Sequence, residues 1–263
     1  MRPTWSRRLL VAVCALIDFF LMLPLLVVFP ISLSSAPYMQ FPPPGLSWQW
    51  YERYLDDPQW IDSTGRSVYI GGATAFLALA LGVPLAFSLV RGRFIGRVLV
   101  DRLALAPIIV PTIILSVAVY GLFAKLKLIG TWYGLVVVHT VLAMPFVVLV
   151  IAAGLRDFDH SLEQAAEGLG AGRWQTLRRV TLPLLRPSLV SAGLLAFISS
   201  FDELVVALFL AGANMTLPKK MFDNIMMEID PTIAAVSVMQ ILLVSVVLVL
   251  IGRFGRGLRD SVR

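Results

Sequence analysis

The sequence is poor in cysteine and in charge, and both shortages narrow its class. Its only cysteine, Cys14, lies inside an apolar run, so the chain has no intrachain disulfide and no cysteine metal cluster. Charged residues make up 14% of the 263 residues, against about 25% in a soluble domain. Residues of the set AVILMFWYC make up 58%, which leaves too little polar surface to cover a water-soluble globule. These proportions exclude an ordinary cytosolic enzyme, a disordered chain and a disulfide-stabilised secreted domain.

Long apolar runs are what the sequence has instead. Six runs reach the roughly 20 residues that a helix needs to cross a bilayer core. A helix satisfies its own backbone hydrogen bonds within lipid. The predicted fold class is therefore all-α, a polytopic membrane protein with six transmembrane helices in one domain over residues 1–263. The predicted spans are residues 9–29, 68–90, 103–124, 132–154, 188–210 and 231–252.

The basic residues predict how the chain is oriented. Of its 22 lysines and arginines, sixteen lie at the two ends of the chain and in the second-to-third and fourth-to-fifth connections. The positive-inside rule assigns that side to the cytoplasm, so both termini are expected there. The net charge of +6 is then explained by the basic residues on the cytoplasmic side of the membrane. No nucleic-acid partner is therefore expected. The first apolar run, of about 20 residues, is longer than a signal-peptide core, so we expect an uncleaved helix.

Two connections are long enough to carry a function. The external loop, residues 31–67, has a Pro-Gly run at 41–45 followed by aromatic residues, which suit either an interfacial anchor or a docking surface. In the cytoplasmic segment 155–187, Gly170 is placed to end a first short helix in a left-handed conformation. A second helix is predicted over Arg173–Leu182, ended by Pro183. This segment suits either docking of another surface against its small residues or a helix lying on the membrane.

Ionisable residues inside the spans are costly, so they are candidates for a translocation path. They are Asp18, His139, Asp202 and Glu203. The helical spacing of Ser199, Asp202 and Glu203 predicts that these three share one face. His139 and Asp202 lie at similar depth, so they are expected either to line one cavity or to form a buried pair. Asp18 is the weaker candidate, because nothing in its own helix accompanies it.

Residues 164–183 resemble the cytoplasmic motif of the type I, binding-protein-dependent ABC importer permeases. That motif reads E-A-A, three residues, G, nine residues, I, one residue, L-P. Here Gln164 stands where the family has glutamate, with Glu163 adjacent, and Val180 stands where it has isoleucine. The resemblance implies that this segment is a coupling helix seated in a cleft of an ATPase. The residues expected to couple are Glu163, Gln164, Ala165, Ala166, Gly170, Leu182 and Pro183.

Further motifs, along nearly the whole chain, are similar to the polyamine-type branch of these permeases. They are Phe41-Pro42-Pro43-Pro44-Gly45 before Trp50-Tyr51, His139-Thr140 before Pro145, Ser199-Ser200-Phe201-Asp202-Glu203, and Leu217-Pro218 before Glu228-Ile229-Asp230-Pro231-Thr232. The resemblance implies an inner-membrane permease subunit that pairs with a second, different permease. It also implies two ATP-binding subunits and a periplasmic substrate-binding protein. The chain has no G-x-x-x-x-G-K-[ST] phosphate loop, so ATP must be hydrolysed by a partner chain, and no catalytic residue, cofactor or metal is expected here.

The expected cargo is spermidine or putrescine. Asp202 and Glu203 agree with a cation, since carboxylates in a low-dielectric cavity favour ammonium groups. The same importer class with ferric iron, an opine-like compound or sulfate is the alternative. A stand-alone secondary transporter is disfavoured because no internal repeat is visible. An intramembrane serine protease is disfavoured because neither Ser199 nor Ser200 lies in a G-x-S-x-G-like elbow.

Overall fold

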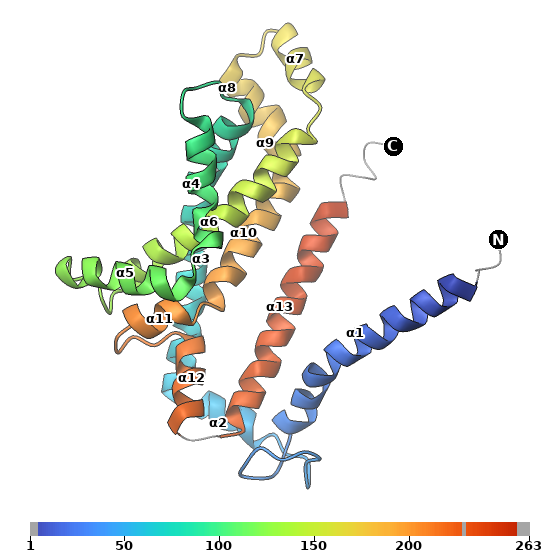
Figure 1. Cartoon of the computed structure of the whole chain (residues 1–263), viewed down its shortest axis with the longest axis vertical. Coiled ribbons are helices and arrows are strands. Elements are labelled where there is room, and N and C mark those ends of the chain that lie inside the picture. Colours follow the sequence, from blue (N-terminus) through green and yellow to red (C-terminus); the bar gives the residue numbers. More distant parts are fainter. Residues whose placement is uncertain (1–4, 228–229, 257–263) are drawn as a thin grey trace. The chain divides into compact units, whose positions relative to one another are not determined.

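The computed structural model describes residues 5–227 and 230–256, and Figure 1 shows these as a series of helices without an extended sheet. The chain divides into two compact parts. One consists of residues 1–61 and 221–243, and the other of residues 62–220 and 244–263. Each part is described by itself. Glu228 and Ile229, which belong to the external motif noted above, lie outside the described residues.

Four helices are individually long and apolar enough to cross a membrane. They are α1 (Trp5–Ser32), α3 (Pro58–Arg91), α6 (Trp132–Arg156) and α13 (Thr232–Arg256). Two bent pairs also pass when each is taken together. In one, α4 (Arg97–Ile109) meets α5 (Thr112–Lys125) at 104°. In the other, residues 173–184 meet α10 (Arg186–Phe201) at 67°. Counting each bent pair as one span gives up to six, in agreement with the predicted all-α membrane fold.

The third span is not the continuous helix that was predicted over residues 103–124. The chain leaves α4 at Val110, which adopts an extended conformation with φ −78° and ψ 125°. Val110 precedes Pro111, and a residue before proline is pushed out of the helical region. Pro111 also lacks the amide hydrogen that a continuing helix requires. The break therefore has a local cause in the sequence.

The fifth span also differs from the continuous helix predicted over residues 188–210. After α10 ends at Phe201, the chain forms a separate short helix, α11 (Val205–Leu210). Asp202 and Glu203 lie in the connection, so the inference that they share a helical face with Ser199 is wrong. Glu203 helps to start α11, because its Oε1 accepts the amide hydrogen of Val206 at a donor–acceptor distance of 3.0 Å.

The core of the second part lies among α3, α6 and α10. Its helices meet through fully buried alanines, namely Ala78, Ala86, Ala143, Ala192 and Ala196. Lipid gives helices no hydrophobic reason to associate, so close approach through small residues supplies van der Waals contact instead. The approach is closest at Gly154, where an added Cβ would lie 2.3 Å from Ser188 Oγ.

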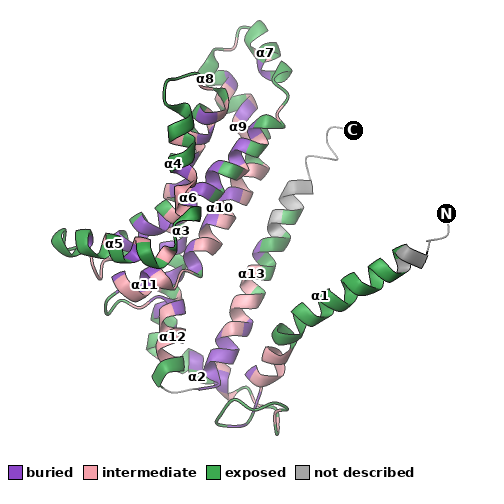
Figure 2. Cartoon of the chain, in the orientation of Figure 1, coloured by how far each residue is buried: buried purple, intermediate pink, exposed green. Residues whose placement is uncertain are grey.

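In the first part, α2 (Gln49–Asp56) and the external loop form a polar cluster. The indole of Trp50 donates to the carbonyl of Ser34 at 2.6 Å, and Ser32 Oγ lies 2.9 Å from the Tyr51 hydroxyl. Arg53 pairs with the buried Asp230 at 3.1 Å. Much of α1 is coloured as exposed in Figure 2. The remaining helix, α12 (Leu217–Met227), crosses from one part to the other in sequence.

Candidate functional site

The first arm of the cytoplasmic segment is α7 (Ser161–Gly168), and a defined hydrogen-bond pattern ends it. Gly170 has φ +90°, as the sequence predicted. Its amide donates to the carbonyl of Glu167 at 2.9 Å, and the amide of Ala171 donates to that of Ala166 at 3.1 Å. This pair of bonds is the Schellman motif. The spacing from Ala166 to Gly170 is therefore the spacing that such a helix end requires.

The second arm runs further than predicted. It consists of α8 (Arg173–Thr176), a π-helical turn η1 (Leu177–Thr181) and α9 (Leu182–Leu184). The prediction that Pro183 ends this helix at Leu182 is wrong. The amide of Leu182 reaches back to the carbonyl of Leu177, and the chain continues from this π-helical turn through Pro183 into α9. The arm then bends into α10.

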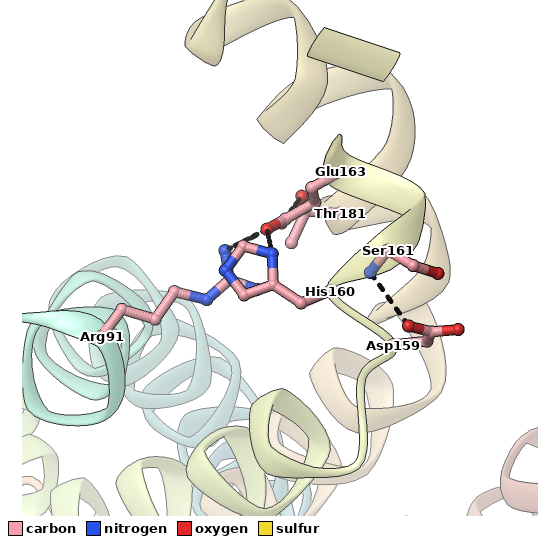
Figure 3. A network of polar contacts seen from close by, with 6 residues as sticks. All are labelled: Arg91, Asp159, His160, Ser161, Glu163 and Thr181. Carbon is pink, nitrogen blue, oxygen red and sulfur yellow. Dashed lines mark hydrogen bonds and ion pairs between the residues drawn. The ribbon is translucent and has the colours of Figure 1, made fainter. Parts of the chain in front are cut away.

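Glu163 ties the two arms to the end of α3, as Figure 3 shows. Arg91 Nη1 donates to both carboxylate oxygens, at 2.8 and 2.9 Å. Thr181 Oγ1, from the second arm, donates to Glu163 Oε1, and His160 Nδ1 lies 3.1 Å from Oε2. The guanidinium of Arg91 also lies over the rings of Phe87 and Phe158, at 5.3 and 5.6 Å from their centroids. One buried carboxylate therefore joins three segments of the chain.

The surroundings of Glu163 decide its protonation state. Burial alone would raise the pKa of its carboxyl, but hydrogen bonds from Thr181 and Arg91, with the charge of Arg91, lower that pKa below its usual value. Nearby, the amide of Ser161 donates to Asp159 Oδ1 at 2.9 Å and lowers the pKa of that carboxyl. Glu163 is thus an ionised partner for Arg91 at neutral pH.

The outer surface of this segment exposes large apolar side chains beside a hollow. Leu169 is 90% exposed and Trp174 is 72% exposed. Beside Leu169 lies a hollow of about 310 Å³, lined by Ala166, Gly170 and Thr176 among others. Gln164 and Ala165 are also exposed on α7. Exposed apolar side chains beside a hollow are typical of a surface that receives a partner.

Within the helices, His139 joins α6 to α10 and α3. Its Nδ1 lies 2.7 Å from Ser200 Oγ, which in turn lies 3.3 Å from Thr74 Oγ1. Because of their similar depth, His139 and Asp202 were expected either to line one cavity or to form a buried pair. The hydrogen-bond partner of His139 is Ser200 instead. His139 and Ser200 are both buried, so this serine–histidine contact is closed to a substrate.

A pocket of about 370 Å³ lies where the two broken helices meet. Residues 107–112, around the break between α4 and α5, form one side. Ser199 and Glu203, around the break after α10, form another, with Leu142 and Phe146 of α6. Asp202 is exposed and is not among the residues that line this pocket. Asp18 is exposed on α1.

Residues 78–260 match the protein family described as binding-protein-dependent transport system inner membrane component. The chain belongs to this family. It is a membrane-spanning permease subunit of an importer of that class, as its cytoplasmic motif predicted. This finding sets aside the stand-alone transporter and the serine protease.

Curated relatives of this permease carry more than one substrate name. It is 33% identical over 226 residues to the putrescine transport system permease protein PotI of Escherichia coli, covering 83% of this chain and 80% of that protein. It is 32% identical over 200 residues to the spermidine/putrescine transport system permease protein PotC of Haemophilus influenzae, covering 76% and 78%. It is 31% identical over 179 residues to the sulfate transport system permease protein CysT of Escherichia coli, covering 64% and 65%.

Solved structures agree on the fold. A chain of a bacterial ABC transporter involved in the import of the acidic polysaccharide alginate is similar with a TM-score of 0.70 and 21% identity, covering 95% of this permease and 98% of that chain. A chain of the MetNI methionine ABC transporter in an inward-facing conformation is similar with a TM-score of 0.60 and 23% identity, covering 76% and 98%.

Sequence reasoning missed four residues that the structure brings into the sites. They are Arg91 and Thr181 around Glu163, and Ser200 and Thr74 around His139. Thr181 had a signal, because it is the one variable position between Val180 and Leu182 of the family motif. Arg91 directly follows the predicted span 68–90, but the sequence gives no sign that it reaches residue 163.

Proposed function

We propose that this permease forms the membrane path of an ATP-driven polyamine importer, with spermidine or putrescine as cargo. The observation that carries the proposal is its similarity to two permeases named for these compounds over about four fifths of the chain. A sulfate permease is also similar, over a smaller share. The chemistry of the pocket at the helix breaks supports a cation over an anion.

That pocket has the two features that a polyamine requires. Polyamines carry ammonium groups separated by methylene chains. Glu203 supplies a carboxylate for an ammonium group, and Ile108, Val110 and Phe146 supply apolar walls for methylenes. Broken helices in the membrane are also where transporters place their binding sites, because the interrupted backbone lines a cavity. We therefore assign Glu203 and Ser199 to the path, with Asp202 at its edge.

The cytoplasmic segment 155–187 is proposed as the coupling loop that meets an ATP-binding subunit. Exposed Leu169 and Trp174 supply apolar contacts for that partner. Ala165, Ala166 and Gly170 keep α7 and its corner free of bulk, and Leu182 and Pro183 join the loop to α10. Glu163, clamped to Arg91 and Thr181, passes a displacement of the loop to α3.

The complete importer is proposed to contain a second, different permease, two ATP-binding subunits and a periplasmic binding protein. The sixteen basic residues on the side of the coupling loop support cytoplasmic termini. The external segments taken together carry seven acidic and six basic residues, so we propose that capture of the cation belongs to the binding protein.

The test of the path is uptake of labelled putrescine by cells that express the whole importer. Glu203→Gln removes the charge but keeps an oxygen for the Val206 amide, so α11 is preserved. We expect at least about tenfold less uptake, because a hydrogen bond to a charged group contributes about 1.5–3 kcal/mol. Asp202→Asn makes the same change one residue away, at the edge of the path and outside the pocket lining, and is expected to lower uptake less than Glu203→Gln. Unchanged uptake in the double variant removes both acids from the path, and sulfate uptake by the unaltered importer overturns the polyamine assignment.

A further inference from the structure

A second pocket, of about 460 Å³, lies away from the proposed path at the ends of three helices. It is lined by the end of α3, the first turns of α4 and the last turns of α6. These ends lie on one side of the membrane, because only residues 92–96 connect α3 to α4 and because α6 leads directly into the coupling loop. The pocket therefore lies at the level of the lipid headgroups next to that loop.

Three charged side chains line this pocket, in a pattern of two positive charges and one negative. Arg97 and Asp101 are one turn apart on α4, and Arg156 is the last residue of α6. None of the three takes part in an ion pair with another residue that the structure describes. All three are exposed, so they are available to a ligand.

The rest of the lining is apolar. It consists of Leu89, Val90, Val98, Leu105, Val148, Leu149, Ala152 and Ala153. A ligand that fits this pocket must combine a charged head with hydrocarbon. Basic pockets between membrane helices on the cytoplasmic side bind the phosphates of anionic lipid headgroups, and the volume lies within the range of small-molecule sites.

We propose that this pocket binds the headgroup of a phosphatidylethanolamine molecule. Guanidinium groups bind phosphate oxygens through paired hydrogen bonds, so Arg97 and Arg156 receive the phosphate. Asp101 accepts hydrogen bonds from the ethanolamine ammonium, and the apolar wall receives the start of the acyl chains. The charge pattern of the protein is thus the complement of one zwitterionic headgroup.

Asp101 gives the site its selectivity between lipids. Phosphatidylglycerol has hydroxyls that can donate a hydrogen bond to Asp101, but it has no ammonium to balance the charge of that carboxylate. Phosphatidylcholine has a trimethylated ammonium with no N–H to donate. Of these three headgroups, only the primary ammonium of phosphatidylethanolamine offers the carboxylate both hydrogen-bond donors and a positive charge. The leaflet is the cytoplasmic one, and this detail rests on the orientation proposed above.

The experiment measures lipid binding to the intact importer complex, purified, delipidated and titrated with one defined lipid at a time. Native mass spectrometry counts the lipid molecules retained. For the unaltered complex we expect tighter retention of dioleoyl phosphatidylethanolamine than of dioleoyl phosphatidylcholine or phosphatidylglycerol. Equal or tighter retention of phosphatidylglycerol overturns the headgroup assignment, and no retained lipid overturns the proposal that this pocket binds a lipid. This comparison needs no variant that must fold.

Variants then assign the retained lipid to this pocket. Arg97→Gln and Arg156→Gln should each weaken binding about tenfold, the loss expected for one charged hydrogen-bond partner. Asp101→Asn should leave the phosphate bound but remove the preference over phosphatidylcholine. Arg102→Gln is the control, because Arg102 is exposed on the same helix and does not line the pocket. If Arg102→Gln weakens lipid binding as much as the pocket variants do, the lipid binds at another place on the complex. Binding is measured without transport, so a wrong polyamine assignment leaves the result unaffected.

Discussion

At the scale of single residues, Glu163 is the side chain with the most partners in the coupling loop. Glu163→Gln keeps its size but leaves Arg91 without an ionised partner. We expect a loss of about 1–3 kcal/mol in the stability of the loop and weaker stimulation of ATP hydrolysis by the loaded binding protein. Thermal unfolding and ATPase assays of the purified complex measure both. Glu167→Gln makes the same change at an exposed position of α7 and is the control. An equal effect of this variant would show that the change in net charge, and not the loss of the contacts of Glu163, causes the loss of stability.

The same carboxylate predicts a dependence on pH. Its pKa is lowered in the folded protein, so folding favours the ionised form. The resulting stabilisation is present above the usual glutamate value of 4.5 and is lost as the pH falls through the lowered value. The difference in melting temperature between the unaltered protein and Glu163→Gln should therefore be largest near neutral pH and should shrink on acidification. A difference that grows in acid contradicts this account.

At the scale of elements, the corner after α7 offers a comparison of two glycines. An added Cβ meets no atom within 4 Å at either Gly168 or Gly170, but only Gly170 has a positive φ. Gly170→Ala should destabilise the loop by about 1–2 kcal/mol, the cost of a left-handed conformation for a residue with Cβ. Gly168→Ala should be neutral or stabilise by up to about 1 kcal/mol. Transport rate and protease sensitivity of the loop measure the contrast, and equal behaviour of the two variants shows that the corner conformation is not required.

The helix breaks mark the limit of what the sequence predicts about elements. Apolar composition identifies where the chain enters lipid, because transfer free energy depends on composition alone. The apolar composition continues without a change through Val110. In the sequence, only Pro111 indicates the 104° bend at this position. The break at Asp202–Leu204 has neither proline nor glycine. The spacing of Asp202 and Glu203 predicted that they lie on one helical face, but Glu203 starts a new helix. Whether Ser199 or Ser200 contacts His139 depends on how the helices pack against each other. The local sequence pattern does not contain that information.

At the scale of the whole molecule, the orientation of the chain can be tested by labelling. In a Cys14→Ser background, Leu46→Cys and Leu169→Cys introduce single thiols at positions that are 76% and 90% exposed. A membrane-impermeant maleimide added to intact spheroplasts should label residue 46 and not residue 169. After permeabilisation, residue 169 should be labelled in cells without the ATP-binding subunits and protected when they are present. Labelling of residue 169 in intact spheroplasts would reverse the proposed orientation.

The hydrogen bonds that link His139, Ser200 and Thr74 also restrict how the importer changes shape. If α10 slid by one helical turn along its axis, Ser200 would move by about 5.4 Å, out of reach of both partners. The bonds therefore oppose axial slip of α10 against α6 and α3, and the buried alanines leave no room for a compensating shift. We therefore expect these three helices to move together. We expect bending during the transport cycle to concentrate where the helical hydrogen bonds are already interrupted, at Val110–Pro111 and at Asp202–Leu204.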